Sequence, residues 1–138
     1  FATMRRGKYL LLLFGLWAGC SDTFKLPEYG SDIEDNEDPI ITVVSPEENF
    51  TYNGLTQIPV NLTVTDNFEL EAVQLQLNPS NVVGDGISFT RTVSDSIFSI
   101  DTVYTFPAGD SIVFDVLVVA NDVVNNTAFK SFSFTAVK

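Results

Sequence analysis

From Pro39 onward the chain contains segments in which apolar and polar residues alternate with a period of two, and this pattern restricts the fold more than any other feature of the chain. The clearest run, residues 57–65, reads QIPVNLTVT and has an apolar residue at every second position. Because successive side chains of a strand point to opposite faces of a sheet, this spacing is typical of a strand with one buried face. No segment after Cys20 repeats apolar residues with the period of a helix, so the sequence predicts an all-β domain.

Runs of this kind recur along the chain, separated by turn-forming sequences such as Asn53-Gly54 and Pro107-Ala108-Gly109-Asp110. They predict seven strands, at residues 40–45, 57–65, 70–78, 86–93, 97–105, 111–121 and 127–137. Seven short strands at this spacing predict a two-sheet sandwich of the immunoglobulin type. A closed barrel is the alternative all-β architecture.

The segment Met4–Cys20 reads MRRGKYLLLLFGLWAGC and has the order of an export signal: basic residues, an apolar run, then small residues. Its apolar run is shorter than the ~20 residues that a membrane span requires. Cys20 is the only cysteine and therefore has no partner for an internal disulfide. The segment resembles the signal of bacterial lipoproteins, in which the terminal cysteine is acylated and becomes the mature N-terminus. Plain secretion and a permanent membrane anchor are the alternatives.

The resemblance implies that residues 1–19 comprise a short upstream extension and a lipoprotein signal peptide, and that Cys20 is lipidated. Residues 20–38 follow as an acidic stretch with no apolar periodicity. A stretch of this composition does not bury enough apolar surface to offset its ordering entropy, so it is predicted to be a flexible tether. It also resembles the acidic signals that send some lipoproteins to the outer face of the outer membrane.

The charge of the chain after Cys20 excludes several classes of partner. All 18 acidic residues lie there, against only four basic residues, Lys25, Arg91, Lys130 and Lys138. Such a surface repels phosphate backbones, so no nucleic-acid partner is expected, and the membrane contact is expected to be the N-terminal lipid alone. With no histidine and one cysteine, the usual zinc and copper sites are excluded, whereas oxygen-ligand cations such as calcium are not.

Three segments resemble bacterial immunoglobulin-like and cadherin-like domains. Residues 39–46 (PIITVVSP) resemble their opening strand, residues 64–73 (VTDNFELEAV) their passage from the second to the third strand, and residues 119–126 (VANDVVNN) their last turn. The resemblance covers residues 39–138 and implies one immunoglobulin-like domain, of a family without an assigned function.

Acidic and amide side chains follow the predicted strands at one end of such a sandwich. The start of the first strand and two of the loops meet at that end, and cadherin-type domains bind calcium with acidic loops of this kind. Calcium takes six to eight oxygen ligands. The alternative is that these side chains only close turns by bonding their own backbone. The candidate calcium ligands are Asp38, Asp66, Asn67, Glu69, Asp122 and Asn125; no other cofactor is expected.

A second pattern, Asp followed by Ser or Thr and then an apolar residue, occurs at Ser96, Thr102 and Ser111. It resembles an O-glycosylation sequence of exported bacterial proteins, and the alternative is a strand edge that follows a turn. No catalytic residues are predicted, because the chain lacks histidine, a nucleophile elbow and a phosphate-binding loop.

Together these features predict a non-enzymatic lipoprotein of the cell envelope, anchored to the outer membrane, with exposure on the cell surface if the acidic stretch is an export signal as well as a tether. It is expected to act as a binding or adhesion module for a protein or glycan partner. One alternative is a structural accessory subunit of an envelope assembly, bound through an edge strand. The other is a carbohydrate-binding accessory of a glycan-uptake system.

Overall fold

A computed structural model describes residues 34–138, which belong to one compact unit. The predicted signal peptide, Cys20 and most of the predicted tether lie outside the described residues. Residues 34–138 contain eight strands and no helix, so none of them forms a helix that could span a membrane. The strands are β1 (Ile40–Ser45), β2 (Thr51–Asn53), β3 (Gln57–Thr65), β4 (Leu70–Pro79), β5 (Ile87–Thr92), β6 (Ile97–Thr105), β7 (Ser111–Asp122) and β8 (Thr127–Val137).

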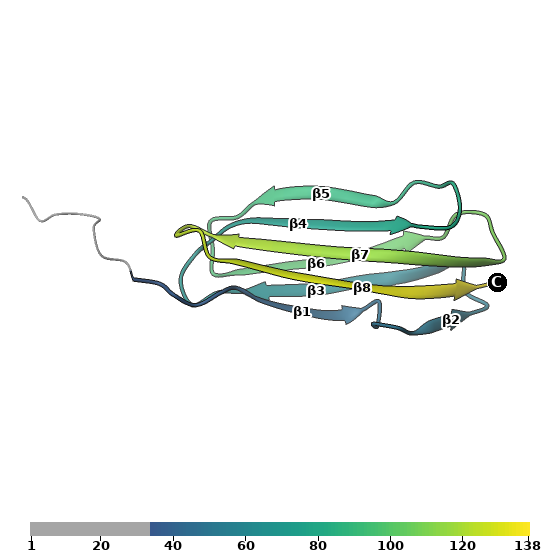
Figure 1. The fold of residues 1–138 in the computed structure, drawn as a ribbon, viewed down its shortest axis with the longest axis horizontal. Helices are drawn as coiled ribbons and strands as arrows, with labels where there is room; N and C mark the ends of the chain where they lie inside the picture. The colour runs from purple at the N-terminus through teal and green to yellow at the C-terminus, as the bar shows by residue number, and fades with distance from the viewer. Residues whose placement is uncertain (1–33) are drawn as a thin grey trace, which may run out of the picture. The chain divides into compact units, whose positions relative to one another are not determined.

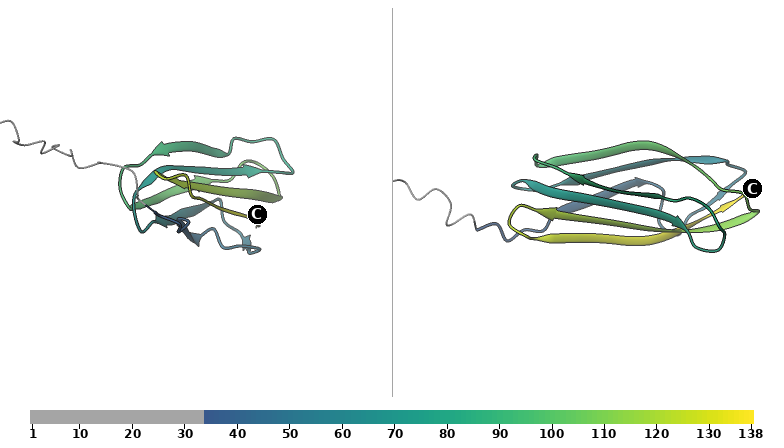
Figure 2. Two further views of the ribbon diagram at one scale, coloured as in Figure 1. Left: turned by 60° about the vertical axis from the view of Figure 1, so that its left-hand side comes forward. Right: turned by 90° about the horizontal axis from the view of Figure 1, so that it is seen from above.

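The strands form two sheets that lie face to face (Figures 1 and 2). One sheet has three strands in the order β1-β3-β6, and the other has five in the order β2-β8-β7-β4-β5. All pairs are antiparallel except β2 with β8. The predicted all-β sandwich is therefore confirmed, and each of the seven predicted strands is present with ends that differ by at most one residue.

The alternating pattern places the core between the sheets. In β3 the side chains of Ile58, Val60, Leu62 and Val64 are all buried, and the intervening residues lie on the outer face. The same alternation buries every second residue of β7, from Ile112 onward. Because this core closes within residues 34–138, the sandwich supplies its own apolar packing.

Aromatic rings fill one part of the core. Phe114 and Phe134 stack with their ring centroids 4.8 Å apart, and Phe106 stacks on Phe114 at 5.3 Å. Tyr104 meets Phe114 edge to face at 5.6 Å, and its hydroxyl donates a hydrogen bond to the Asp85 carbonyl at 2.7 Å. Burial, together with the negative charge of Asp85, raises the pKa of the Tyr104 hydroxyl, so it stays a donor at neutral pH.

Strand β2 was not predicted, because it has only three residues and no room for an alternating pattern. It runs parallel to the end of β8, pairing Thr51–Asn53 with Thr135–Val137. Its central residue, Tyr52, packs edge to face on Phe134 at 5.7 Å and accepts a hydrogen bond from the Glu47 N–H at 2.9 Å. A tertiary contact therefore fixes this strand, which its local sequence does not specify.

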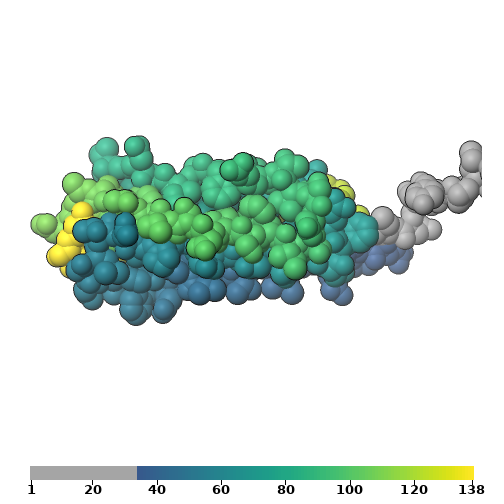
Figure 3. Space-filling view, turned by 180° about the vertical axis from the view of Figure 1, so that it is seen from behind, coloured from purple at the N-terminus to yellow at the C-terminus, as the bar shows by residue number. Residues whose placement is uncertain are grey.

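The outer face of the three-stranded sheet mixes apolar and polar side chains. Ile40 and Ile97 are exposed on either side of Thr65, and Val103 is exposed beside Pro59. Strands β1 and β6 are the edges of this sheet. Figure 3 shows this side of the molecule, with β6 in green along its middle and no deep hollow.

Candidate functional site

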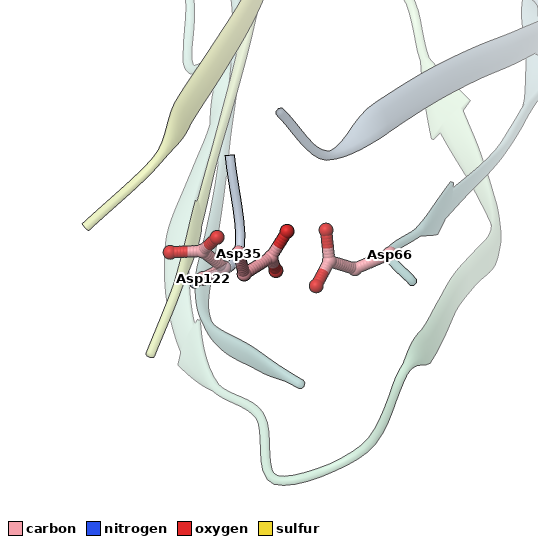
Figure 4. A group of neighbouring side chains, drawn as sticks. All are labelled: Asp35, Asp66 and Asp122. Atoms are coloured by element: carbon pink, nitrogen blue, oxygen red, sulfur yellow. The ribbon is translucent and has the colours of Figure 1, made fainter. Parts of the chain in front are cut away.

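Three aspartates from distant parts of the sequence meet at one end of the sandwich. Asp35 lies in the segment before β1, Asp66 follows β3, and Asp122 is the last residue of β7. Each contributes a carboxylate oxygen, and these oxygens lie within 4.8 Å of one another. Figure 4 shows Asp35 between the other two, with its carboxylate facing that of Asp66. We call these three residues the carboxylate cluster.

Asp122 is the fully buried member of the carboxylate cluster, with 0% of its surface exposed. Its Oδ1 accepts hydrogen bonds from the backbone N–H groups of Val124 (2.9 Å) and Asn126 (2.7 Å). Its Oδ2 accepts from the Asn126 side-chain amide at 2.6 Å. Asn125 completes the turn with a positive φ of 73°, a conformation that asparagine tolerates better than most residues. The carboxylate of Asp122 therefore organises the whole β7–β8 turn.

Asp66 makes a similar but smaller turn between β3 and β4. Its Oδ2 accepts a hydrogen bond from the Phe68 N–H at 3.0 Å, and its own N–H donates to the Ser96 carbonyl at 2.9 Å. Its Oδ1 is buried and has no hydrogen-bond partner in the described part of the chain. One oxygen of this carboxylate thus accepts the hydrogen bond of the turn, while the other has no donor among the described residues.

Asp35 places the segment before β1 beside Asp66 and Asp122. Its Oδ1 accepts hydrogen bonds from the Glu37 N–H (3.1 Å) and the Asn67 side-chain amide (3.0 Å). Its Oδ2 is the second buried oxygen without a partner among the described residues. The Asn126 amide also donates to the carbonyls of Asp35 and Glu37, at 3.0 and 3.1 Å. Residues 35–37 fall within the predicted tether, yet these hydrogen bonds hold them against the sandwich.

Within residues 34–138, no positively charged side chain donates a hydrogen bond to the carboxylate cluster. All the donors that reach the three carboxylates are backbone N–H groups and the amides of Asn67 and Asn126. Of the basic side chains in this range, Lys138 bonds the Pro107 carbonyl and Lys130 lies over the ring of Phe132. A buried carboxylate oxygen without a donor is unfavourable, and neighbouring carboxylates repel each other.

A hard divalent cation fits this donor set. Calcium is bound in proteins by carboxylate, amide and backbone oxygens in a flexible geometry. The oxygens of Asp35 and Asp66 that lack donors are available to it, and the buried Asp122 adds negative charge beside them. The described residues therefore bring together, from three separate segments, carboxylate oxygens of the kind that calcium binds.

The structure distributes the other predicted calcium ligands as follows. Asn67 contacts the carboxylate cluster through its amide, which donates to Asp35. Asp38 is exposed and does not belong to the cluster. The Glu69 carbonyl accepts a hydrogen bond from Val123, and Asn125 provides the positive φ of the β7–β8 turn.

The proposed O-glycosylation residues occupy three different settings. Thr102 is exposed in the edge strand β6, and Ser111 is exposed at the start of β7, where its carbonyl accepts from the Asn81 amide at 3.0 Å. Ser96 is half-buried in the turn before β6, and its N–H donates to Asp95 at 2.7 Å. Modification at these residues stays a prediction. The lipidation residue, Cys20, lies outside the described residues.

Comparison with known proteins gives no relative from which a function follows. No protein-family model matches the sequence, and a search of curated proteins gives no significant match. The function of this chain is therefore inferred from its sequence, its fold and the carboxylate cluster.

Proposed function

We propose that this chain is a non-enzymatic binding module of the bacterial cell envelope, anchored by a lipid on Cys20. Its domain is an immunoglobulin-like sandwich that takes up calcium at the end where the anchored segment enters. The lipoprotein-like segment Met4–Cys20 supports the anchor. The absence of histidine from the sequence supports a non-enzymatic role. A pulse of labelled palmitate should enter the full chain in cells and fail to enter the Cys20→Ala variant; labelling of both, or of neither, would contradict the anchor.

The order of the strands supports the immunoglobulin-like assignment. The predicted strands, lettered A to G, correspond in order to β1, β3, β4, β5, β6, β7 and β8. An immunoglobulin constant-type domain groups A, B, E and D in one sheet and C, F and G in the other. Six of the seven strands follow this grouping here, and only β5 differs, because it pairs with β4 instead of joining the sheet of β1. This difference is compatible with the wider group of sandwiches that share the architecture without sequence similarity.

The observation that carries the calcium proposal is the pair of buried carboxylate oxygens without donors, on Asp35 and Asp66. Because Asp35 precedes β1 and Asp66 follows β3, a cation between them links the incoming segment to the sandwich. The amide of Asn126 already brings the backbone of this segment to the same point. Calcium would therefore add to the hydrogen bonds that already hold residues 35–37 against the sandwich.

Calcium should stabilise the unit of residues 34–138. At a concentration one hundred times its dissociation constant, a ligand of the folded state adds about 2.7 kcal/mol, which for a domain of this size raises Tm by roughly 10 °C. The Asp66→Asn variant should lose most of this increase, because its amide cannot supply a charged ligand oxygen. Thermal unfolding in calcium and in chelator measures both effects.

The chelator arm of the same experiment separates a cation site from a merely structural turn. Without cation, Asp66→Asn removes the repulsion with Asp35 and keeps an oxygen for the Phe68 N–H. Its Tm in chelator should therefore equal or exceed that of the natural sequence. Asp115→Asn, an exposed change on β7, serves as the matched control and should leave the calcium response intact. An equal Tm in calcium and in chelator for the natural sequence would contradict the proposal.

A further inference from the structure

The outer face of the five-stranded sheet carries an uncharged surface on this acidic molecule. Alternation along β4, β7 and β8 turns every second side chain outward, opposite buried residues such as Leu75 and Val118. Two adjacent rows across these strands contain amide, hydroxyl and apolar side chains and no charge. We call this surface the neutral face; its residues are Gln74, Gln76, Leu117, Val119, Phe129 and Ser131.

The strand register fixes the arrangement of these residues. Phe129 is paired with Val119, which is paired with Gln74 on the next strand. Ser131, Leu117 and Gln76 form the adjacent row in the same way. Neighbouring strands lie about 4.8 Å apart, so Phe129 and Gln74 are separated by about 10 Å across a flat surface. This distance suits a ligand of more than one ring that lies across the strands.

Phe129 is the most unusual residue of the neutral face, because 75% of its surface is exposed. Strand β2 covers the edge of β8 only from Thr135 to Val137, so β8 is the outermost strand of its sheet at Phe129. The ring therefore contributes little to the core of this chain. Its apolar surface is available to a ligand, and covering it would be favourable.

Charge restricts the class of that ligand. The described residues include 15 titratable carboxylates, so an anionic ligand or a second copy of the chain is repelled. A cationic ligand finds no carboxylate within the neutral face, where the adjacent charge is Asp115 in the next row. A neutral ligand is not repelled by the acidic surface and requires no carboxylate at its binding site.

We propose that the neutral face binds a neutral oligosaccharide. The C–H side of a sugar ring packs on the ring of Phe129, while the amides of Gln74 and Gln76 both donate to and accept from its hydroxyl groups. This inference rests on the binding function proposed above and names its class of ligand. The neutral face shares no residue with the carboxylate cluster, so glycan binding and calcium binding can be tested independently.

Affinity electrophoresis of the full chain in detergent tests this proposal, with starch, xylan, β-1,3-glucan and galactomannan as neutral probes and polygalacturonate as the anionic probe. At least one neutral polysaccharide should retard the natural sequence, and polygalacturonate should not. Phe129→Ala should weaken the retardation about tenfold or more, whereas Phe129→Tyr should retain it. Gln76→Ala provides a second, polar variant and should weaken it severalfold. Phe50→Ala, an exposed aromatic outside the neutral face, is the matched control and should leave it unchanged.

Several results would overturn the proposal. One is that none of the four neutral probes retards the natural sequence. Another is that the Phe129→Ala variant, with a Tm equal to that of the natural sequence, is retarded to the same extent. Retardation by polygalacturonate alone would also refute a neutral ligand. Sedimentation that shows a dimer, dispersed by Phe129→Ala, would assign the neutral face to a second copy of the chain instead.

Discussion

Replacing Phe114 with alanine should lower the free energy of unfolding by about 3–5 kcal/mol, the range for a large aromatic residue removed from a core. Phe114 has 0% of its surface exposed, stacks with the rings of Phe134 and Phe106, and meets Tyr104 edge to face. Its removal leaves a cavity and takes away three aromatic contacts. Domains of this size have a stability of about 5–15 kcal/mol, so the variant should be close to its unfolding threshold.

Urea unfolding of residues 34–138, followed by circular dichroism, measures this loss. Phe129→Ala is the matched control, because the same substitution there removes a ring that is 75% exposed and should change stability by less than about 1 kcal/mol. If the two variants lost equal stability, the aromatic core described here would be wrong.

Replacing Asp122 with alanine should cost about 2–4 kcal/mol, even in chelator, where no cation contributes. The change removes the acceptor of three partly buried hydrogen bonds and takes away the partner of the Val124 and Asn126 N–H groups. Asp122→Asn keeps an acceptor oxygen at this position, so its loss should be about half as large.

The same urea experiment distinguishes this role from a general charge effect. Asp115→Ala removes an exposed carboxylate from the same strand and should change stability by no more than about 0.5 kcal/mol. Equal losses for Asp122→Ala and Asp115→Ala would show that the β7–β8 turn does not depend on the Asp122 carboxylate.

Most of the fold could be predicted from the sequence because the core lies on one face of each long strand. In β3 and β7 the apolar residues recur at every second position, and this period defines both the strand and its buried face. Two features depend on tertiary contacts and were not visible. Strand β2 forms because Tyr52 packs on Phe134, and β5 pairs with β4 across the loop of residues 80–86, which no local pattern assigns to either sheet.

The candidate site could be predicted only in part. Asp66 and Asp122 follow strands in turn-forming sequences, so their position at one end of the sandwich followed from the topology. Asp35 was not predicted as a ligand because it lies in a run of acidic residues whose composition predicts a tether. Within that run, no sequence feature distinguishes Asp35 from its acidic neighbours. Its distinction is tertiary: the amides of Asn67 and Asn126 hold this part of the chain against the sandwich.

The central claim is that the carboxylate cluster binds calcium, and isothermal titration of residues 34–138 tests it most directly. We expect one calcium ion per chain for the natural sequence and for Asp115→Asn, and no saturable binding for a variant that combines Asp35→Asn with Asp66→Asn. The absence of calcium binding by the natural sequence, or equal binding by the double variant, would contradict the account.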